Sequence, residues 1–342
     1  MSAPTLVEVA RLAGVSRSTA SRVLSGTGSA SSSTELRVRA AAKQAGYRVN
    51  RAARTLRTNR TYLIGVILNN LQNSTFHVVA EVAQRRLAEN GYRMILCITG
   101  GDETEEALYL DTLAEQRVDG LIIVGSGSNS ERLHAMQRSG TAIVNLIRAG
   151  DESPGDRVLA ADAQGAVLAT ELLLGLGHRR IAFIGGHDGS NSGRERLEGF
   201  LATMDRARVR SEDLVFQGDF SMSFGRDAVR RILQMGDLPT ALYLANHEAS
   251  LGALPELRER KIRIPLDLSI VAHEEAAWFR YWDPPLAVID NGPGELAEVA
   301  VARLMKAMSS KESQNFPREY RIGARLILRE STRPLELPHQ MV

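Results

Sequence analysis

The sequence predicts a small all-α head followed by a larger α/β body made of two lobes. Helix-start signals and short helical patterns fill the first 46 residues, whereas from Leu63 onwards short apolar runs alternate with amphipathic helical stretches. The charge changes sign at the same place, because residues 1–60 carry eleven basic and two acidic side chains while residues 61–342 carry a net charge of −7. A chain of 342 residues is long enough for about two domains and a smaller module.

The head begins with two short helices around a glycine. Thr5-Leu6-Val7-Glu8 has the spacing of a capping box, which predicts a helix that starts at Thr5. Gly14 ends this helix, and the hydroxyl of Ser16 can cap a second one. Apolar residues recur at helical spacing in both segments: Leu6, Val9, Ala10 and Ala13 in the first, and Ala20, Val23 and Leu24 in the second. Two short helices around such a turn form a helix-turn-helix.

A third helix follows in the head. Ser32-Ser33-Thr34-Glu35 is a second capping box, and Gly46 supplies the stop signal. Between them lie the residues that we expect to pack inward, Leu36, Val38, Ala41, Ala42 and Ala45.

The body consists of strands that alternate with helices. Strands are predicted at residues 63–68, 94–98, 121–124, 142–147, 181–184, 214–216, 241–244, 268–271 and 286–289, and the first helices at 76–90, 103–116 and 130–139. Such alternation favours parallel sheets covered by helices on both faces. About ten strands are many for one open sheet, so we expect two doubly wound lobes with a ligand crevice at the carboxyl ends of the strands.

Composition and cysteine usage favour a cytoplasmic globular protein. Hydrophobic residues make up 44% of the chain and charged residues 24%. The single cysteine, Cys97, lies in an apolar run and is expected to be a buried thiol. The first 14 residues lack the pattern of a signal peptide, and no apolar run approaches the ~20 residues that span a bilayer. We therefore expect no membrane partner.

The second helix has a basic, hydroxyl-rich surface opposite its apolar face. Arg17, Ser18, Ser21 and Arg22 lie on that surface, and no acidic residue occurs from Thr19 to Thr34. The second helix of a helix-turn-helix enters the major groove of DNA, where arginine binds guanine and hydroxyls bind phosphates or base edges. A generic three-helix unit or a solvated basic tail are the alternative interpretations.

The segment Val9–Leu24, VARLAGVSRSTASRVL, resembles the DNA-binding head of the lactose-repressor (LacI/GalR) family. Asn50–Arg57, NRAARTLR, resembles that family's hinge, which becomes a helix on operator DNA and inserts its leucine into the minor groove. The resemblance implies a sequence-specific transcriptional regulator, a repressor, that binds a pseudo-palindromic operator as a homodimer. The DNA-binding residues expected on this basis are Leu6, Ser16, Arg17, Ser18, Thr19, Ser21, Arg22, Tyr47, Asn50, Ala53, Arg54, Leu56 and Arg57.

The hinge itself fits a segment that folds when bound. It spans about two helical turns, which is too short for a stable helix alone in water. Leu56 is its only large apolar side chain and lies among arginines, as an apolar wedge flanked by phosphate contacts requires. The alternative is that Leu56 packs against the body.

The resemblance continues through the body, from about Thr5 to about Arg329, with landmarks such as Val118-Asp119-Gly120-Leu121-Ile122. It implies a periplasmic-binding-protein-like body in which the chain crosses between the lobes three times. The predicted organisation is a helix-turn-helix DNA-binding domain at 1–49, a hinge helix at 50–60, a two-lobed effector-binding and dimerisation domain at 61–330 and a tail at 331–342. The tail has no leucine heptads, so the four-chain coiled coil of some relatives is not expected.

Polar residues at strand ends form the candidate effector site. The set consists of Asn70, Asn73, Phe76, Ser126, Arg148, Asp162, Arg196, Phe220, Asn246, Glu274 and Asn291. Amides, carboxylates and guanidinium groups supply the hydrogen bonds that a polyol needs, and Phe220 offers a ring that a sugar can stack on. Each residue taken alone is equally consistent with a solvated loop.

Two arginines in the set favour an anionic effector, a sugar acid or sugar phosphate, over a neutral sugar. Arg148 and Arg196 both follow strands, and a planar guanidinium matches carboxylate or phosphate. Asp162 and Glu274 are the protein's own candidate partners for these cations. If they neutralise the arginines, the site suits a neutral polyol instead, and the residues leave both possibilities open.

Several positions differ from the family's pattern. The chain has Asn246-His247-Glu248, Ala272-His273-Glu274-Glu275, Ala161-Asp162 and Asn73-Ser74-Thr75-Phe76 where the family has Asn-Asp-Glu, Gly-Phe-Asp-Asp, Asp-Asn and Asn-Pro-Phe-Phe. The identity of the effector therefore does not transfer from any relative.

An enzyme that acts on a sugar or nucleotide is the alternative class. The chain has no Gly-Lys pair for a phosphate loop, and Gly292-Pro293-Gly294-Glu295-Leu296-Ala297 matches only a loose dinucleotide fingerprint. His273-Glu274-Glu275 lacks a second histidine one helical turn on, so no metal site is predicted. We expect no cofactor and no catalytic residues.

Overall fold

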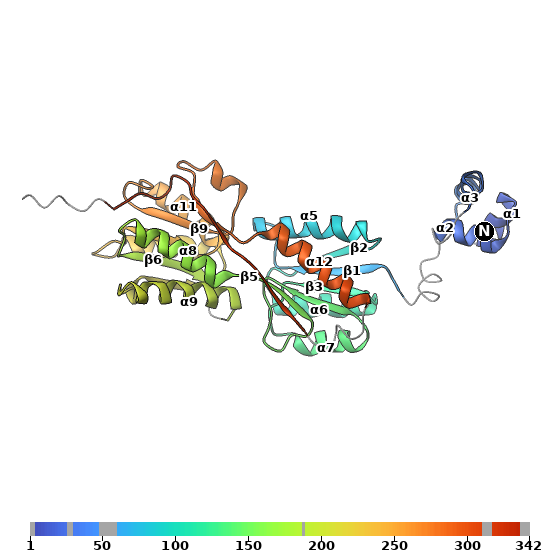
Figure 1. The fold of residues 1–342 in the computed structure, drawn as a ribbon, viewed down its shortest axis with the longest axis horizontal. Coiled ribbons are helices and arrows are strands. Elements are labelled where there is room, and N and C mark those ends of the chain that lie inside the picture. The colour runs from blue at the N-terminus through green and yellow to red at the C-terminus, as the bar shows by residue number, and fades with distance from the viewer. Residues whose placement is uncertain (1–3, 26–29, 48–59, 187–188, 310–316, 336–342) are drawn as a thin grey trace, which may run out of the picture. The chain divides into compact units, whose positions relative to one another are not determined.

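The computed structural model describes residues 4–25, 30–47, 60–186, 189–309 and 317–335. The chain divides into two compact units, Met1–Thr61 and Tyr62–Val342. Figure 1 labels many of their helices and strands. The five hinge residues of the DNA-binding prediction, Asn50, Ala53, Arg54, Leu56 and Arg57, lie outside the described residues.

The described part of the first unit contains three helices, α1 (Leu6–Ala13), α2 (Arg17–Ser25) and α3 (Ser32–Gln44). The Thr5 hydroxyl accepts a hydrogen bond from Glu8 N at 3.3 Å, and Gly14 takes the left-handed conformation at φ 62° that ends α1. Ser16 accepts from Thr19 N at 3.0 Å and caps α2. The small core contains Val9, Ala10, Ala13, Ala20, Val23, Val38, Ala41 and Ala42. The predicted helix-turn-helix is confirmed.

Two details of α3 differ from the prediction. Its N-cap is Ser31, whose extended backbone lets the hydroxyl accept from Thr34 N at 3.4 Å, so the helix is capped one residue before the predicted box. Leu36 was expected to pack inward, but its side chain is 70% exposed. Val38, Ala41 and Ala42 fill the inner face, and Leu36 lies off that face.

The described residues of the second unit form two six-stranded sheets. The first lobe has the strand order β11-β5-β4-β3-β1-β2 and the second lobe has β12-β10-β9-β8-β6-β7. The strands of the first sheet are β1 (Leu63–Leu68), β2 (Arg93–Ile98), β3 (Gly120–Ile123), β4 (Ala142–Leu146), β5 (Asp156–Ala160) and β11 (Glu319–Ile322). Those of the second are β6 (Ile181–Gly186), β7 (Val215–Gly218), β8 (Ala241–Leu244), β9 (Ser269–His273), β10 (Ala287–Asp290) and β12 (Arg325–Ile327).

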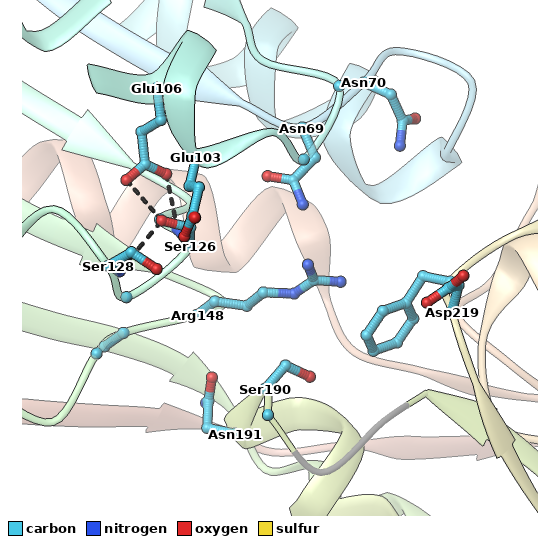
Figure 2. Close-up of a pocket in the computed structure, with 18 of the residues that line it drawn as sticks. Asn69, Asn70, Glu103, Glu106, Ser126, Ser128, Arg148, Ser190, Asn191 and Asp219 are labelled. Atoms are coloured by element: carbon cyan, nitrogen blue, oxygen red, sulfur yellow. Dashed lines mark hydrogen bonds between the residues drawn. The ribbon is translucent and has the colours of Figure 1, made fainter.

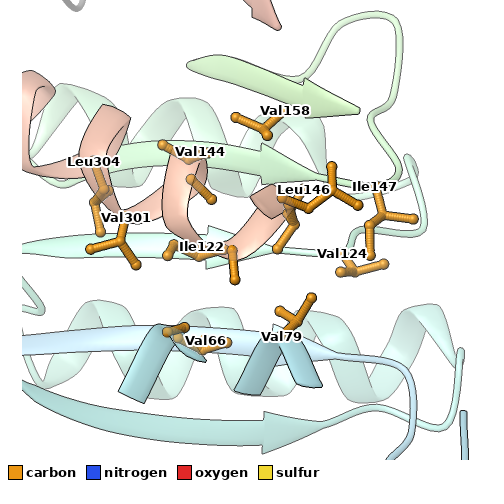
Figure 3. Close-up of a cluster of buried hydrophobic side chains, with 14 of the residues drawn as sticks. Val66, Val79, Ile122, Val124, Val144, Leu146, Ile147, Val158, Val301 and Leu304 are labelled. Carbon is orange, nitrogen blue, oxygen red and sulfur yellow. The ribbon is translucent and has the colours of Figure 1, made fainter. Parts of the chain in front are cut away.

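Both sheets are covered by helices. The first carries α5 (Ser74–Glu89), α6 (Glu103–Glu115), α7 (Ser130–Arg138) and α12 (Pro293–Ser309), and the second carries α8 (Asp162–Gly175), α9 (Asn191–Arg206), α10 (Met222–Leu233) and α11 (His247–Glu259). Figure 3 shows Val301 and Leu304 of α12 beside Val144 and Ile122 of the first sheet, with Val79 of α5 in the same buried cluster. Because both faces of each sheet are buried, the sequences of the strands are continuous apolar runs.

The chain passes between the lobes at three places. It leaves the first sheet after β5, returns from β10 to α12, and crosses again between β11 and β12. The turn at Gly292, with φ 62°, therefore leads from a strand of one sheet to a helix on the other. A dinucleotide loop requires a strand and helix of one βαβ unit, so the loose fingerprint at 292–297 is a crossing between lobes.

Three strands, β5, β11 and β12, were absent from the predicted set, and β12 pairs antiparallel with β10 although parallel sheets were expected. Residues beyond 330 also contact the body, since Ser331 Oγ accepts a hydrogen bond from Ala287 N at 2.8 Å and Leu335 N donates to Leu176 O at 2.8 Å. Among the described helices, none combines the length and the apolar character needed to cross a membrane.

Candidate functional site

The candidate DNA-binding residues of the head lie on and around α2. Arg17, Ser18 and Arg22 are exposed, whereas Ser21 and Thr19 are half-buried. The Ser16 hydroxyl lies 2.8 Å from both the Ser18 and Thr19 hydroxyls, so the start of α2 is a cluster of hydroxyl groups beside exposed arginines. The remaining described members, Leu6 and Tyr47, are half-buried and pack against the head's core.

A cavity of about 500 Å³ lies in the body at the carboxyl ends of the strands (Figure 2). Both lobes line it: residues that follow β1, β2, β3 and β4 come from the first lobe, and residues that follow β6, β7 and β8 come from the second. Its lining is mostly polar, with Asn69, Asn70, Glu103, Glu106, Ser126, Ser128, Arg148, Asp151, Ser190, Asn191, Arg194, Asp219 and Glu248. Helices α5, α6, α7, α9, α10 and α11 all begin near these loops.

Five of the predicted effector residues line this cavity: Asn70, Phe76, Ser126, Arg148 and Phe220. The other six, Asn73, Asp162, Arg196, Asn246, Glu274 and Asn291, are buried outside the lining. Contacts of all eleven residues with an effector remain predictions.

Arg148 is the central cation of the cavity. Figure 2 shows its side chain extending across the cavity toward Asp219. With the Asn69 amide oxygen turned toward it, Nη1 of Arg148 donates a hydrogen bond of 2.8 Å, and its guanidinium carbon lies 4.3 Å from the centre of the Phe220 ring. Nε is buried without a hydrogen-bond partner in the described part of the chain. Burial lowers the pKa of Arg148, but a guanidinium stays protonated at neutral pH.

Glu106 positions a part of the cavity wall by hydrogen bonds. Its carboxylate is buried and accepts hydrogen bonds from Ser126 N at 2.7 Å, Ser126 Oγ at 2.9 Å and Asn129 Nδ2 at 3.0 Å. These bonds hold the loop after β3 in place (Figure 2). The sequence prediction missed Glu106 because an acidic residue in the first turn of a helix is usually a favourable partner of the helix dipole. Asn69 and Asp219 were also missed, although each directly precedes a predicted site residue.

Arg196 is neutralised inside the second lobe. Its guanidinium donates to Asp162 Oδ1 at 2.7 Å, to Glu274 Oε1 at 2.9 Å and to Ala245 O at 2.7 Å, and only 2% of the residue is exposed. Burial alone would raise the pKa of Asp162, but Arg196 and a hydrogen bond from His273 outweigh it and lower the pKa to about 2. The protein's own carboxylates therefore satisfy one of the two predicted cations.

The network extends to buried aromatic and histidine side chains. Tyr243 Oη lies 2.6 Å from His273 Nδ1, and His273 Nε2 lies 3.0 Å from Asn291 Oδ1. Burial and the charge of Arg196 lower the pKa of His273, which is therefore neutral near pH 7. Among the described residues, no cluster of histidine, cysteine or carboxylate side chains could hold a metal ion.

Asn73 joins this network to the first lobe. As the N-cap of α5, it accepts a hydrogen bond from Thr75 N at 2.9 Å. Its Nδ2 donates to Glu274 at 3.1 Å and to Glu248 at 3.1 Å, both in the second lobe. Because Glu248 also lines the cavity, the contact between lobes and the candidate binding surface share a side chain.

Comparison with known proteins decides the family. Residues 5–50 match the model of bacterial regulatory proteins of the lacI family, and residues 170–332 match the periplasmic binding protein-like domain. The HTH-type transcriptional repressor PurR of Aliivibrio salmonicida (strain LFI1238) is 30% identical over 333 residues, which cover 97% of this chain and 99% of that protein. The chain belongs to the LacI family. It is a DNA-binding transcriptional repressor and not an enzyme.

Solved structures of the lac repressor and of a second transcriptional regulator are similar to this chain. The lac repressor dimer bound to operator and the anti-inducer ONPF has a TM-score of 0.81 at 26% identity, covering 96% of this chain and 99% of that chain. The complex of the transcriptional regulator CelR with cellobiose has a TM-score of 0.72 at 26% identity over the same shares.

Proposed function

We propose that this LacI family repressor binds a pseudo-palindromic operator as a homodimer and that a small effector held between the lobes of its body sets the affinity. The observation that carries the proposal is that both lobes line the cavity, so a ligand there contacts both and favours one arrangement of the lobes over another. The operator-bound dimer of the lac repressor and the cellobiose complex of CelR support the two halves of the proposal.

On the DNA side, α2 is the recognition helix and Arg17 and Arg22 read bases. Their exposure and the hydroxyl cluster at Ser16, Ser18 and Thr19 support this assignment, because hydroxyls at a helix start suit phosphate contacts. The hinge residues, with Leu56 as the minor-groove wedge, complete the interface.

On the effector side, the ligand is a sugar-like molecule with an anionic group, a sugar acid or sugar phosphate. The carboxylates and amides of the lining suit hydroxyl groups. Arg148 suits the anion, since among the described residues no carboxylate forms an ion pair with it and its Nε has no hydrogen-bond partner. The anion therefore belongs at Arg148, whereas Arg196 is neutralised by Asp162 and Glu274.

The DNA half is tested with an operator selected from a random pool and with a random duplex of equal length. Arg17→Ala is expected to weaken operator binding by about 1–3 kcal/mol and random binding much less, because a base contact is lost. Arg39→Ala is the matched control, since Arg39 lies on α3 and pairs with Glu35. Equal losses of Arg17→Ala on both duplexes would assign Arg17 to phosphate contacts.

The effector half is tested by a thermal-shift screen of sugars, sugar acids and sugar phosphates, followed by operator titrations with each stabilising compound. A compound that raises the melting temperature and changes operator affinity supports the proposal. If only neutral sugars stabilise the protein, the proposal that the effector carries an anionic group is wrong.

A further inference from the structure

The end of the first lobe at which its strands begin lies next to the DNA-binding unit along the chain. Strand β1 starts at Leu63, and Leu63 pairs with Arg93, the first residue of β2. Strands β3 and β4 continue the same parallel register, so all four strands start side by side. The chain enters this end at Tyr62, directly after the unit that ends at Thr61.

Each of the three strand starts beside β1 is accompanied by an exposed arginine. Arg93 begins β2, Arg117 precedes β3, and Arg138 ends α7 before β4. Lys306 is exposed in the last turn of α12, and it lies at the same end because Leu304 on that turn packs against the start of β3. We call Arg93, Arg117, Arg138 and Lys306 the basic edge.

Three of these cations have no acidic partner. Among the described residues, no carboxylate forms an ion pair with Arg93, Arg138 or Lys306. In the second lobe, by contrast, Arg180 directly precedes β6 and pairs with Asp213 at 3.1 Å. A helix dipole favours cations at the ends of α7 and α12, but it does not account for Arg93, which begins a strand.

The acidic residues near the basic edge are mostly engaged within the protein. Glu89, Glu115 and Asp119 are the acids within four residues of it along the chain. Glu89 pairs with Arg86 at 3.2 Å, and the Asp119 carboxylate accepts a hydrogen bond from Tyr62 N at 2.9 Å. The edge is therefore locally positive, although residues 61–342 carry a net charge of −7.

We propose that the basic edge binds phosphates of the operator DNA, in addition to the contacts of the head. The inference rests on the proposed function, because it requires operator binding. DNA is the partner that fits, since this end of the body is the one that the chain reaches from the DNA-binding unit, and arginine and lysine bind phosphates irrespective of sequence.

The spacing of the strands suits separate phosphate contacts. The starts of β2 and β4 are three strand spacings apart in the sheet, which is about 14 Å. This separation is comparable with the ~12 Å width of the major groove, so Arg93 and Arg138 can bind different phosphates. The body then adds affinity for DNA but no base preference.

The test measures binding of the full chain to an operator duplex selected from a random pool and to a random duplex of equal length, between about 50 and 200 mM salt. For Arg93→Gln/Arg138→Gln, the slope of log affinity against log salt is expected to become shallower by about 0.9 per lost contact, about 1.8 in all. At the lowest salt both duplexes are expected to bind at least about tenfold more weakly, because phosphate contacts carry no sequence information.

Two further variants control for charge and for folding. Arg208→Gln/Arg210→Gln removes two exposed arginines that follow α9 in the second lobe, and it is expected to keep the wild-type slope on both duplexes. Arg93→Lys/Arg138→Lys keeps both charges and is expected to retain most of the slope. All four positions are exposed, so each variant is expected to melt like the wild type.

The outcomes separate failure of this inference from failure of the proposed function. If the wild type prefers its operator but Arg93→Gln/Arg138→Gln keeps the wild-type slope, or if the second-lobe control loses as much slope, the inference is overturned and operator binding stands. A loss confined to the operator duplex would assign the two arginines to base contacts and also overturn it. A wild-type protein that binds both duplexes equally overturns the proposed function itself.

Discussion

Arg196 shows how one buried cation can be stable in the second lobe. Its guanidinium meets three acceptors, two carboxylates and a carbonyl, at 2.7–2.9 Å. A buried ion pair stabilises a fold only when its hydrogen bonds are also satisfied, and removing one partner leaves a buried charge without compensation. The contribution of Asp162 can be measured from how the free energy of unfolding depends on pH.

The first prediction at this scale concerns Asp162. Its pKa is about 2 in the folded chain and about 3.8 ordinarily, so its carboxylate stabilises the fold above pH 3.8, and this contribution is lost as the pH falls through about 2. Asp162→Asn is expected to lower the free energy of unfolding at pH 7 by about 2 kcal/mol and to flatten its decline between pH 4 and 2. Urea unfolding across that range measures both effects.

Asp267→Asn provides the control for this pH dependence. Hydrogen bonds from Arg263 also lower the pKa of Asp267 to about 2, but both side chains lie at the surface, with Arg263 67% exposed. Solvent screens such a pair. We therefore expect Asp267→Asn to change the decline of the free energy of unfolding between pH 4 and 2 much less than Asp162→Asn does. Parallel stability curves for wild type and Asp162→Asn would contradict the assigned role of Asp162.

At the scale of elements, the start of α3 offers a direct comparison of two neighbouring serines. Ser31 has extended backbone angles and accepts from Thr34 N, whereas Ser32 is the first helical residue. Ser31→Ala is expected to destabilise the head by about 1 kcal/mol, and Ser32→Ala by much less. Hydrogen exchange of the α3 amides in the full chain measures the difference. Equal effects, or a larger effect of Ser32→Ala, would favour the capping box read from the sequence.

The same serines show why boundaries are harder to predict than elements. Ser31, Ser32 and Ser33 offer the same hydroxyl at three successive positions, and only the backbone angles select one of them. The apolar runs of the body are less ambiguous, because a fully buried parallel strand needs a continuous apolar segment. The predicted strand at 63–68 is therefore matched by β1 at the same residues.

The strands that the sequence did not reveal have polar ends or exposed positions. Asp156 begins β5, and its carboxylate accepts from Arg303 at 2.8 Å and from Arg318 N at 2.9 Å, both far along the chain. Strand β11, with the sequence EYRI, buries only Ile322. No local pattern marks such strands, because the residues that hold them lie far away in the sequence: β11 pairs with β5, and Arg303 and Arg318 donate to Asp156.

The candidate site could be predicted only in part, because the sequence shows which residues follow a strand but not which way their side chains turn. Asn70, Ser126 and Arg148 follow apolar runs, so the sequence places them at the cavity edge. Whether a side chain turns into the cavity or into a buried network depends on partners that only tertiary packing brings together, as for Asn73 and Glu274.

At the scale of the whole body, the lobes are joined by three crossings and by a few polar contacts. Ser74 Oγ donates to Glu275 O at 2.7 Å, and Asn73 donates to Glu248 and Glu274. These bonds link the start of α5 in the first lobe to loops of the second. An effector that binds Glu248 therefore acts on a side chain that already takes part in lobe closure.

The last prediction tests this link with Asn73→Asp. The aspartate keeps an acceptor for Thr75 N at the N-cap, so α5 is expected to stay folded. It removes the donor to Glu248 and Glu274 and places a negative charge beside two others, which opposes lobe closure. Two hydrogen bonds to charged groups are lost, each of about 1.5–3 kcal/mol, and the effector's influence on operator affinity is expected to fall by about tenfold or more. Small-angle scattering of the variant should show a larger radius of gyration than the wild type.

Asn90→Asp, the same change at the exposed C-cap of α5, is the control and should alter neither measurement. An unchanged scattering curve together with a normal effector response in Asn73→Asp would show that these bonds do not control closure.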